Sequence, residues 1–269
     1  MGKNHPIGIF DSGIGGLTVV RTFLEKLPLE GFIYFGDTAH VPYGNKSEVQ
    51  LLQYARDIMA FFSSREVKAV LVACGTHSSV TLPQIKADYP IPMVGMVKAG
   101  ASAACRSTGN NRVGVLATQA TVTSGAYSRA IKAIKPNCQT FEVACPGLVP
   151  LVEEGCISGE KPYAAVQHYL LPLLQQHIDT LVLGCTHYPF LSEIIHELAG
   201  PEIQLVDPAM EAVAELRAIL QANDLLNSNG PQSPPQFLVS GNDASFYRVG
   251  KSLLGNIIDK VESVTLVHV

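Results

Sequence analysis

Short runs rich in apolar and β-branched residues recur along the whole chain, separated by stretches with a helical pattern. Each run has the length of a strand, and most end at Gly, Asp, Cys or Pro. They show little polar alternation, as expected for strands that are buried on both faces. The runs span residues 7–10, 32–35, 69–73, 93–97, 112–116, 140–144, 180–183, 203–206 and 236–239.

The stretches between these runs include helical patterns over residues 49–63, 123–134 and 162–176. Strands that alternate with helices predict an α/β fold with mainly parallel sheets. The chain of 269 residues is long for one domain of average size and comfortable for two small ones. Because crossover connections between parallel strands are right-handed, we expect ligands at the carboxyl ends of the strands.

Composition excludes several classes of protein. Hydrophobic residues make up 47% of the chain and charged residues 16%, which favours a buried core over disorder. The net charge is −4 and Lys and Arg form no block, so nothing indicates binding to nucleic acid or to an anionic membrane surface. No stretch approaches the roughly 20 apolar residues of a membrane span, and no secretory signal is visible. We therefore expect a cytoplasmic protein.

Two segments of the chain look like copies of one another. Residues 68–77 read Lys-Ala-Val-Leu-Val-Ala-Cys-Gly-Thr-His, and residues 179–187 read Asp-Thr-Leu-Val-Leu-Gly-Cys-Thr-His. Residues 6–13 and 112–118 form a second, earlier pair. Any two buried strands resemble each other, which is the alternative explanation. The shared Cys, Thr and His just past each strand end favour a repeat, because loops at that position carry function rather than packing.

Six cysteines are present, without a CxxC pair or the spacing of a zinc site. Disulfides are not expected in a cytosolic protein of this size, and most of the cysteines are interpreted as small buried hydrophobic residues. The four cysteines interpreted in this way are Cys105, Cys138, Cys145 and Cys156. The repeated strands, in contrast, would each present one thiol, Cys74 and Cys185.

A facing pair of thiols suits a racemase. Such an enzyme removes a proton from one face of a carbon and supplies one to the other face, which requires two acid/base groups. A cysteine serves as either, since its ordinary pKa of about 8.5 lies close to the working pH.

Three further residues are candidates to support the thiols. Asp11 ends the first strand, and the Gly-rich turn after it lets backbone N–H groups approach an anion. His187 lies two residues after Cys185, although a lone His is also common as a buried core residue. Glu153 is a candidate carboxylate that could equally be an ordinary surface residue.

Together these motifs resemble bacterial glutamate racemase, of the aspartate/glutamate racemase superfamily. The likeness extends over nearly the whole chain, in the family's order and spacing. It rests on residues 10–17 (Phe-Asp-Ser-Gly-Ile-Gly-Gly-Leu), 36–44, 73–76 (Ala-Cys-Gly-Thr), 145–153, 184–189 (Gly-Cys-Thr-His-Tyr-Pro) and 237–241.

The resemblance implies a fold and an activity. The fold would be two pseudo-symmetric α/β domains, residues 1–97 with 208–269 and residues 98–207, with the active site in the cleft between them. The activity would be interconversion of L- and D-glutamate by a two-cysteine proton transfer at Cα, without pyridoxal phosphate or metal. It would supply D-glutamate for peptidoglycan synthesis, in a cytoplasmic homodimer that binds neither nucleic acid nor membrane.

The resemblance also assigns roles to residues. Cys74 and Cys185 would be the catalytic thiols, with Asp11 on the Cys74 side and His187 with Glu153 on the Cys185 side. The substrate contacts would be Asp11, Ser12, Tyr43, Gly44, Gly75, Thr76, Thr186 and His187.

Two residues depart from the family pattern. Gly75 stands where many members have Asn, and His77 stands where many have a small residue. We expect His77 to mirror His187 and to alter the charge state around Cys74. The alternatives are a racemase of aspartate or another acidic amino acid and a non-catalytic binding protein of the same fold. A one-cysteine decarboxylase is disfavoured, because both cysteines are present.

Overall fold

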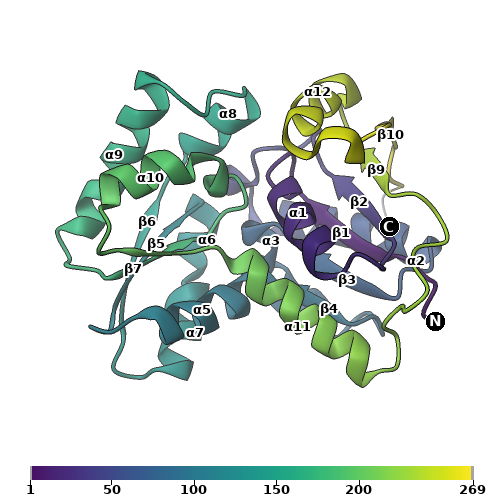
Figure 1. Ribbon diagram of the computed structural model, residues 1–269, viewed down its shortest axis with the longest axis horizontal. Helices are drawn as coiled ribbons and strands as arrows, with labels where there is room; N and C mark the ends of the chain where they lie inside the picture. The colour runs from purple at the N-terminus through teal and green to yellow at the C-terminus, as the bar shows by residue number, and fades with distance from the viewer. Residues whose placement is uncertain (1, 268–269) are drawn as a thin grey trace.

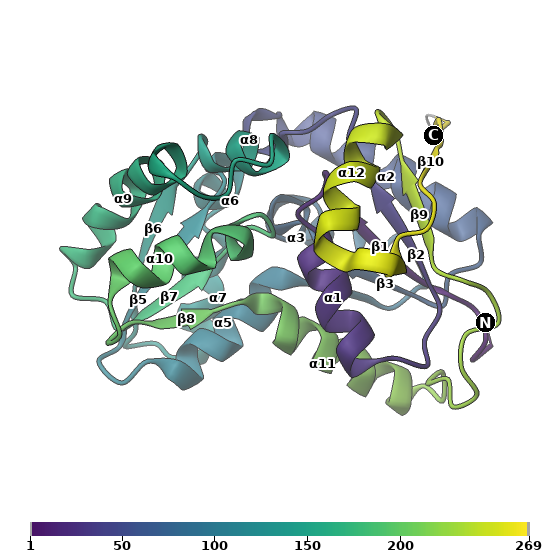
Figure 2. The ribbon, with the colours of Figure 1, turned by 45° about the horizontal axis from the view of Figure 1, so that its top comes forward.

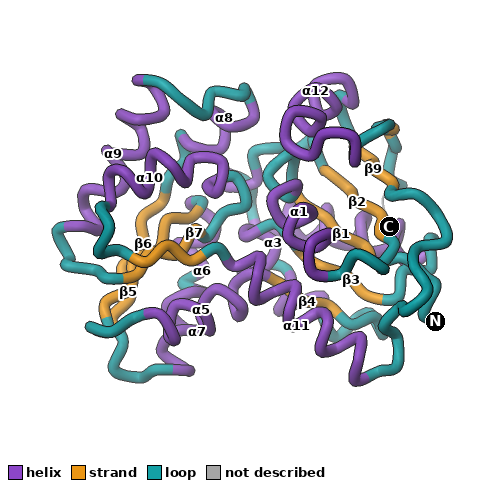
Figure 3. Tube along the Cα trace, viewed as in Figure 1, coloured by secondary structure: helices purple, strands orange, loops and turns teal. Residues whose placement is uncertain are grey.

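The protein is built on two parallel sheets that lie side by side, each flanked by helices (Figures 1 and 3). The structure is a computed structural model that describes residues 2–267. The expected first domain begins at residue 1 and ends at residue 269, so its two outer ends lie outside the described residues.

The first sheet has the order β10-β9-β2-β1-β3-β4, and all its neighbouring strands run parallel. Its strands are β1 (Ile7–Asp11), β2 (Phe32–Gly36), β3 (Ala69–Val72), β4 (Met93–Gly95), β9 (Gln236–Val239) and β10 (Glu262–Ser263). The second sheet has the order β6-β5-β7-β8 and is also parallel. Its strands are β5 (Arg112–Ala117), β6 (Gln139–Ala144), β7 (Thr180–Leu183) and β8 (Gln204–Val206).

The two sheets repeat one arrangement, which confirms the internal repeat. In the first, β1 lies between β2 and β3, with β4 beyond β3; in the second, β5 lies between β6 and β7, with β8 beyond β7. The strands that lead into the two conspicuous cysteines, β3 and β7, therefore occupy equivalent places. Since the carboxyl ends of parallel strands share one edge of a sheet, each sheet presents its cysteine at its ligand-binding edge.

Helices cover both faces of each sheet, which is why the strands are apolar on both sides. On the first sheet, Ile7 and Ile9 pack toward the helix after β1, whereas Phe10 and Phe35 pack against the helix that precedes β3. The larger helices are α1 (Leu17–Lys26), α2 (Glu48–Ser64), α5 (Met96–Ser107), α7 (Ala126–Ile134), α9 (Glu160–Leu174), α10 (Ser192–Ala199), α11 (Pro208–Ala222) and α12 (Asp243–Leu254). The shorter ones are α3 (Gly75–Val80), α4 (Leu82–Ile85), α6 (Gln119–Ser124), α8 (Leu148–Glu153) and the 3-10 helices η1 (Tyr43–Asn45), η2 (Tyr188–Leu191) and η3 (Gly255–Ile257).

The chain crosses between the two sheets twice, from β4 into α5 and from β8 into α11. Helices α5 and α11 lie against each other, and α11 also contacts α1 of the first half (Figure 2). Asp207 begins α11, because its side chain accepts a hydrogen bond from the amide of Ala209 at 2.9 Å. This pair of helices joins the two halves at the side of the molecule that α11 occupies in Figure 1.

A buried ion pair fixes the start of β3. The ammonium of Lys68 lies 2.5 Å from the Glu30 carboxylate, and neither side chain is accessible to solvent beyond 1%. Lys68 also donates to the carbonyl of Leu225 at 2.9 Å, in the segment that leads from α11 to β9. The pair therefore holds the C-terminal part of the chain against the first sheet.

All nine expected strands are present, with three differences in detail. The run 93–97 ends as a strand at Gly95, because α5 begins at Met96. The helical pattern over 123–134 is divided between α6 and α7 by Gly125, whose φ of 60° ends the first helix. The two-residue strand β10 was not expected. Within residues 2–267, no helix combines the length and the hydropathy needed to cross a membrane.

Candidate active site

The two thiols lie at the carboxyl ends of the equivalent strands β3 and β7. Cys74 follows β3 and Cys185 follows β7, and both are buried, with 4% and 6% of their surface exposed. They are close enough for their charges to interact, and Cys74 also feels the charge of Asp11. The sequence-predicted thiols and carboxylate thus converge on one buried place between the two sheets.

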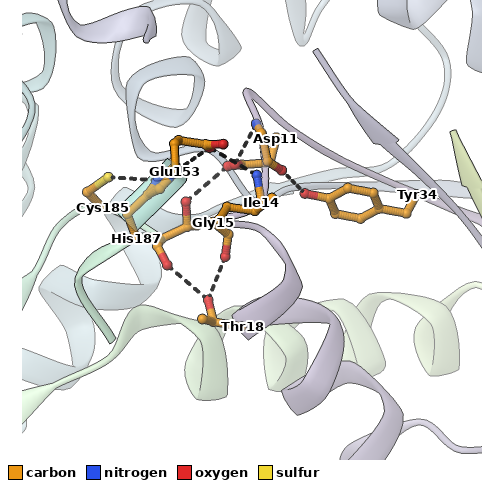
Figure 4. A network of polar contacts seen from close by, with 10 residues as sticks. Asp11, Ile14, Gly15, Thr18, Tyr34, Glu153, Cys185 and His187 are labelled. Atoms are coloured by element: carbon orange, nitrogen blue, oxygen red, sulfur yellow. Dashed lines mark hydrogen bonds and ion pairs between the residues drawn. The ribbon is translucent and has the colours of Figure 1, made fainter. Parts of the chain in front are cut away.

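On the second-sheet side, three side chains form a row (Figure 4). The Sγ of Cys185 lies 3.6 Å from Nδ1 of His187, and Nε2 of His187 lies 2.7 Å from Oε1 of Glu153. The same carboxylate oxygen accepts the amide of Ile14 at 3.1 Å, so Glu153 also contacts the Gly-rich turn of the first half. Glu153 ends α8 and keeps about a fifth of its side chain exposed, at 21%.

His187 is held in its protonated form by these neighbours. Burial works against the charge, but hydrogen bonds with Cys185 and Glu153 outweigh it and place the pKa of His187 well above its usual value. An imidazolium that lies between the Cys185 sulfur and the Glu153 carboxylate can supply a proton at Cys185, and the neutral imidazole that remains can take it back.

Asp11 bridges the two halves of the site. Its Oδ1 accepts the hydroxyl of Thr186 at 3.1 Å, and its Oδ2 accepts the amide of Gly13 at 3.2 Å. The hydroxyl of Thr18 donates in turn to the carbonyl of Thr186 at 3.2 Å (Figure 4). Complete burial raises the pKa of Asp11, against the opposing charge of His187. These contacts tie the first-sheet loop directly to the loop that carries Cys185.

Cys74 is held as a thiol at neutral pH. Burial raises its pKa strongly, and the charge of Asp11 adds to the effect. Backbone hydrogen bonds from His77 and Thr76 act in the opposite direction without reversing it. The first-sheet sulfur is therefore suited to donate a proton.

His77 does not mirror His187, and the expectation that it does was wrong. Its Nδ1 lies 2.8 Å from the hydroxyl of Thr81, and its Nε2 has no hydrogen-bond partner within residues 2–267. The ring is fully buried, edge-on to Phe10 and Tyr43. Burial lowers the pKa of His77 to about 3, so the ring is neutral and adds no charge beside Cys74.

The loop that carries Tyr43 and Gly44 packs over the first-sheet side. Tyr43 is buried, and its hydroxyl donates to Asp37. Asp37 also accepts the hydroxyl of Ser240 at 2.6 Å and lies 2.9 Å from Nδ1 of His40. Asp37 was not among the candidate site residues, although it stands in one of the motifs. It fixes the Tyr43 loop to the C-terminal part of the chain.

Thr118 is a further residue that the sequence reasoning missed. Its hydroxyl lies 2.9 Å from that of Thr76 and donates to that of Thr121 at 3.0 Å. Thr118 follows β5, in the place that corresponds to the end of β1, and the repeat could therefore have pointed to it. A cavity of about 230 Å³ beside it is also lined by Gly44 and Cys145.

Four further candidates are also buried. Ser12, Gly75, Thr76 and Thr186 are all buried around the two thiols. Cys145 is fully buried, and burial raises its pKa to about 12, as expected for a packing residue. Glu154, next to Glu153, is exposed and forms a long ion pair with Lys161 at 3.6 Å.

Comparisons with known proteins identify relatives over the full length of the chain. The pattern of Asp/Glu/hydantoin racemases matches residues 25–216. A glutamate racemase of Syntrophus aciditrophicus is 45% identical over 99% of this chain and 100% of the relative. One from Neisseria meningitidis is 43% identical over 99% and 98%.

Solved structures of glutamate racemases are also similar to this chain. The glutamate racemase of Francisella tularensis, in complex with D-glutamate, superimposes with a TM-score of 0.88 at 36% identity and 98% coverage of both chains. A glutamate racemase isoform of Bacillus anthracis gives 0.92 at 32% identity, again over 98% of both chains. With two buried thiols at the ends of equivalent strands and relatives of this kind over its whole length, the chain belongs to the Asp/Glu/hydantoin racemase family.

Proposed function

We propose that the protein interconverts L- and D-glutamate without a cofactor. The observation that carries the proposal is the placement of Cys74 and Cys185 at equivalent strand ends, buried and close enough to interact. Relatives named as glutamate racemases over the full length of the chain support glutamate as the substrate.

The chemistry requires one sulfur on each side of the substrate Cα. One sulfur removes the α-proton, and the electron pair of the broken C–H bond stays on the substrate. The other sulfur then gives its proton to the opposite face, where the new C–H bond forms. Each turnover exchanges the protonation states of the two sulfurs, so the reverse reaction uses them in opposite roles. Because the two enantiomers are equally stable, the protein must catalyse the reaction in both directions.

The neighbouring groups support these roles. His187, charged and backed by Glu153, serves the Cys185 side, while burial keeps Cys74 ready as an acid. We infer that Asp11 receives the substrate's ammonium group. The substrate carboxylates would be held by hydroxyl and backbone donors of Ser12, Tyr43, Gly44, Gly75, Thr76, Thr186 and His187.

We also propose a domain division, an oligomeric state and a cellular role for the protein. Residues 1–97 with 208–269 and residues 98–207 would form two domains joined by the two crossings and by α11. The protein would act as a cytoplasmic homodimer that feeds D-glutamate to peptidoglycan synthesis. Sedimentation of the purified protein tests the dimer.

The activity is tested by incubating the purified protein, without added cofactor, with L-glutamate and in parallel with L-aspartate. Chiral chromatography should show D-glutamate and little D-aspartate. Formation of D-aspartate alone would assign another acidic substrate, and absence of both products would leave a binding protein of the same fold.

The pairing of the thiols has its own test. Cys74→Ser and Cys185→Ser should each abolish inversion. Cys105→Ser is the matched control, because Cys105 is half-buried and contacts the carbonyl of Ile131 away from the site. Normal inversion in either of the first two variants would refute the two-thiol assignment.

A further inference from the structure

The loops that carry the two thiols touch at Gly75. A Cβ placed on Gly75 would lie 2.3 Å from the carbonyl oxygen of Gly184 and 3.7 Å from Cα of Cys185. Gly75 follows Cys74 on the first half, and Gly184 precedes Cys185 on the second. The close approach of these two loops at Gly75 and Gly184 therefore depends on the absence of a side chain at position 75.

This contact cannot be relieved by turning a side chain. The amide of Gly184 donates to the carbonyl of Leu116 at 2.8 Å, which fixes that backbone to strand β5. Gly15 approaches the second half as closely, since its Cβ would lie 2.4 Å from Nδ1 of His187, but there it meets a side chain. Position 75 is thus the stiffer of the two contacts.

We propose that Gly75 sets how closely the two halves of the site close, and thereby the separation of the Cys74 and Cys185 sulfurs across the substrate. This inference rests on the proposed racemase function. Carbon and oxygen atoms in ordinary contact lie about 3.5 Å apart, so an alanine would force the two loops apart by roughly 1 Å. Because the two loops follow strands of different sheets, such a separation breaks no strand pairing.

A widened site separates two steps that the wild type couples. One sulfur still reaches Cα and exchanges the α-proton, whereas the opposite sulfur lies too far away to complete inversion. Since a misplacement of about 1 Å costs on the order of 100-fold in rate, we expect kcat to fall by about that factor in both directions. Most substrate donors stay in place, so KM should change much less.

The experiment compares Gly75→Ala with Gly31→Ala. The control adds the same methyl group at a site where its Cβ would meet Pro231 at an ordinary 3.5 Å. Both variants are assayed with L- and D-glutamate in deuterated water. The quantities are kcat, KM, the Tm and the deuterium in the recovered starting enantiomer. We expect Gly75→Ala to show slow inversion with deuterium in the recovered enantiomer, and Gly31→Ala to behave as wild type.

A second measurement does not depend on turnover. Iodoacetamide labelling of Cys74 and Cys185, followed by peptide mass spectrometry, should be faster in Gly75→Ala than in the wild type or Gly31→Ala. Failure of the wild type to invert glutamate would refute the proposed function. The labelling would still show whether Gly75 sets how closely the two halves of the site approach.

Three outcomes would overturn the role of Gly75. They are wild-type kcat in Gly75→Ala, unchanged labelling of both thiols, and a joint fall of Tm and kcat with an unchanged ratio of exchange to inversion.

Discussion

Replacing Glu153 with glutamine removes one charge from the His187 pair while nearly preserving its shape. The Nε2–Oε1 distance is 2.7 Å, and a hydrogen bond to a charged group contributes about 1.5–3 kcal/mol. Because a fifth of Glu153 is exposed, we take the lower figure of about 1.5 kcal/mol. The pKa of His187 should therefore fall in Glu153→Gln, because the carboxylate that raises it is gone.

The same change alters stability with a defined sign. The pKa of folded His187 is raised, so its contribution is fully present below the unfolded pKa of about 6.5 and is lost as pH rises through the folded value. Glu153→Gln should thus lower the free energy of unfolding by about 1.5 kcal/mol near pH 6. The difference from wild type should shrink as pH rises through the folded pKa of His187.

Two assays check this. Titration of the imidazole by NMR, with the signal assigned through His187→Asn, gives the pKa, and urea unfolding at several pH values gives the free energy. Glu154→Gln is the matched control, because the side chain of that neighbour is exposed and pairs with Lys161. The reasoning would be refuted if the pKa of His187 were the same in the two glutamine variants.

Other contacts lead to further expected outcomes. Asp11→Asn removes a charge that raises the pKa of Cys74, so iodoacetamide should label Cys74 at lower pH than in the wild type. Lys68→Met leaves Glu30 buried without its partner and should cost about 3–5 kcal/mol in urea unfolding, with recovery in the double variant Lys68→Met/Glu30→Leu. His77→Phe should change kcat by the same factor for both enantiomers, because the ring of His77 is neutral; different factors for the two enantiomers would contradict its packing role.

The fold followed from the sequence because strands buried on both faces leave a strong apolar signal. The repeat also predicted that β3 and β7 take equivalent places. Boundaries were less secure where one apolar run served two elements, as at Gly95, which ends β4 just before α5. The edge strand β10 consists of two residues, and both are exposed. A segment this short shows no hydrophobic pattern that would predict a strand.

The site was predictable on the Cys185 side and not on the Cys74 side. Cys74 begins helix α3, so His77 lies one turn along that helix, where its ring meets Thr81 at the i+4 position. Cys185 is followed by a turn, and His187 folds back toward the sulfur. Similar Cys–Thr–His sequences thus direct their imidazoles differently, which depends on the backbone after the strand. Thr118 lies far from Thr76 in sequence, so their contact could not be predicted without knowledge of the fold.

In the proposed reaction, two thiols act from opposite faces of one carbon. The most direct measurement converts L-glutamate in deuterated water and analyses both enantiomers by mass spectrometry early in the reaction. We expect the D-glutamate formed to carry deuterium at Cα while the remaining L-glutamate keeps its original proton. D-glutamate that retains the original proton would show that a single group moves it and would refute the two-thiol mechanism.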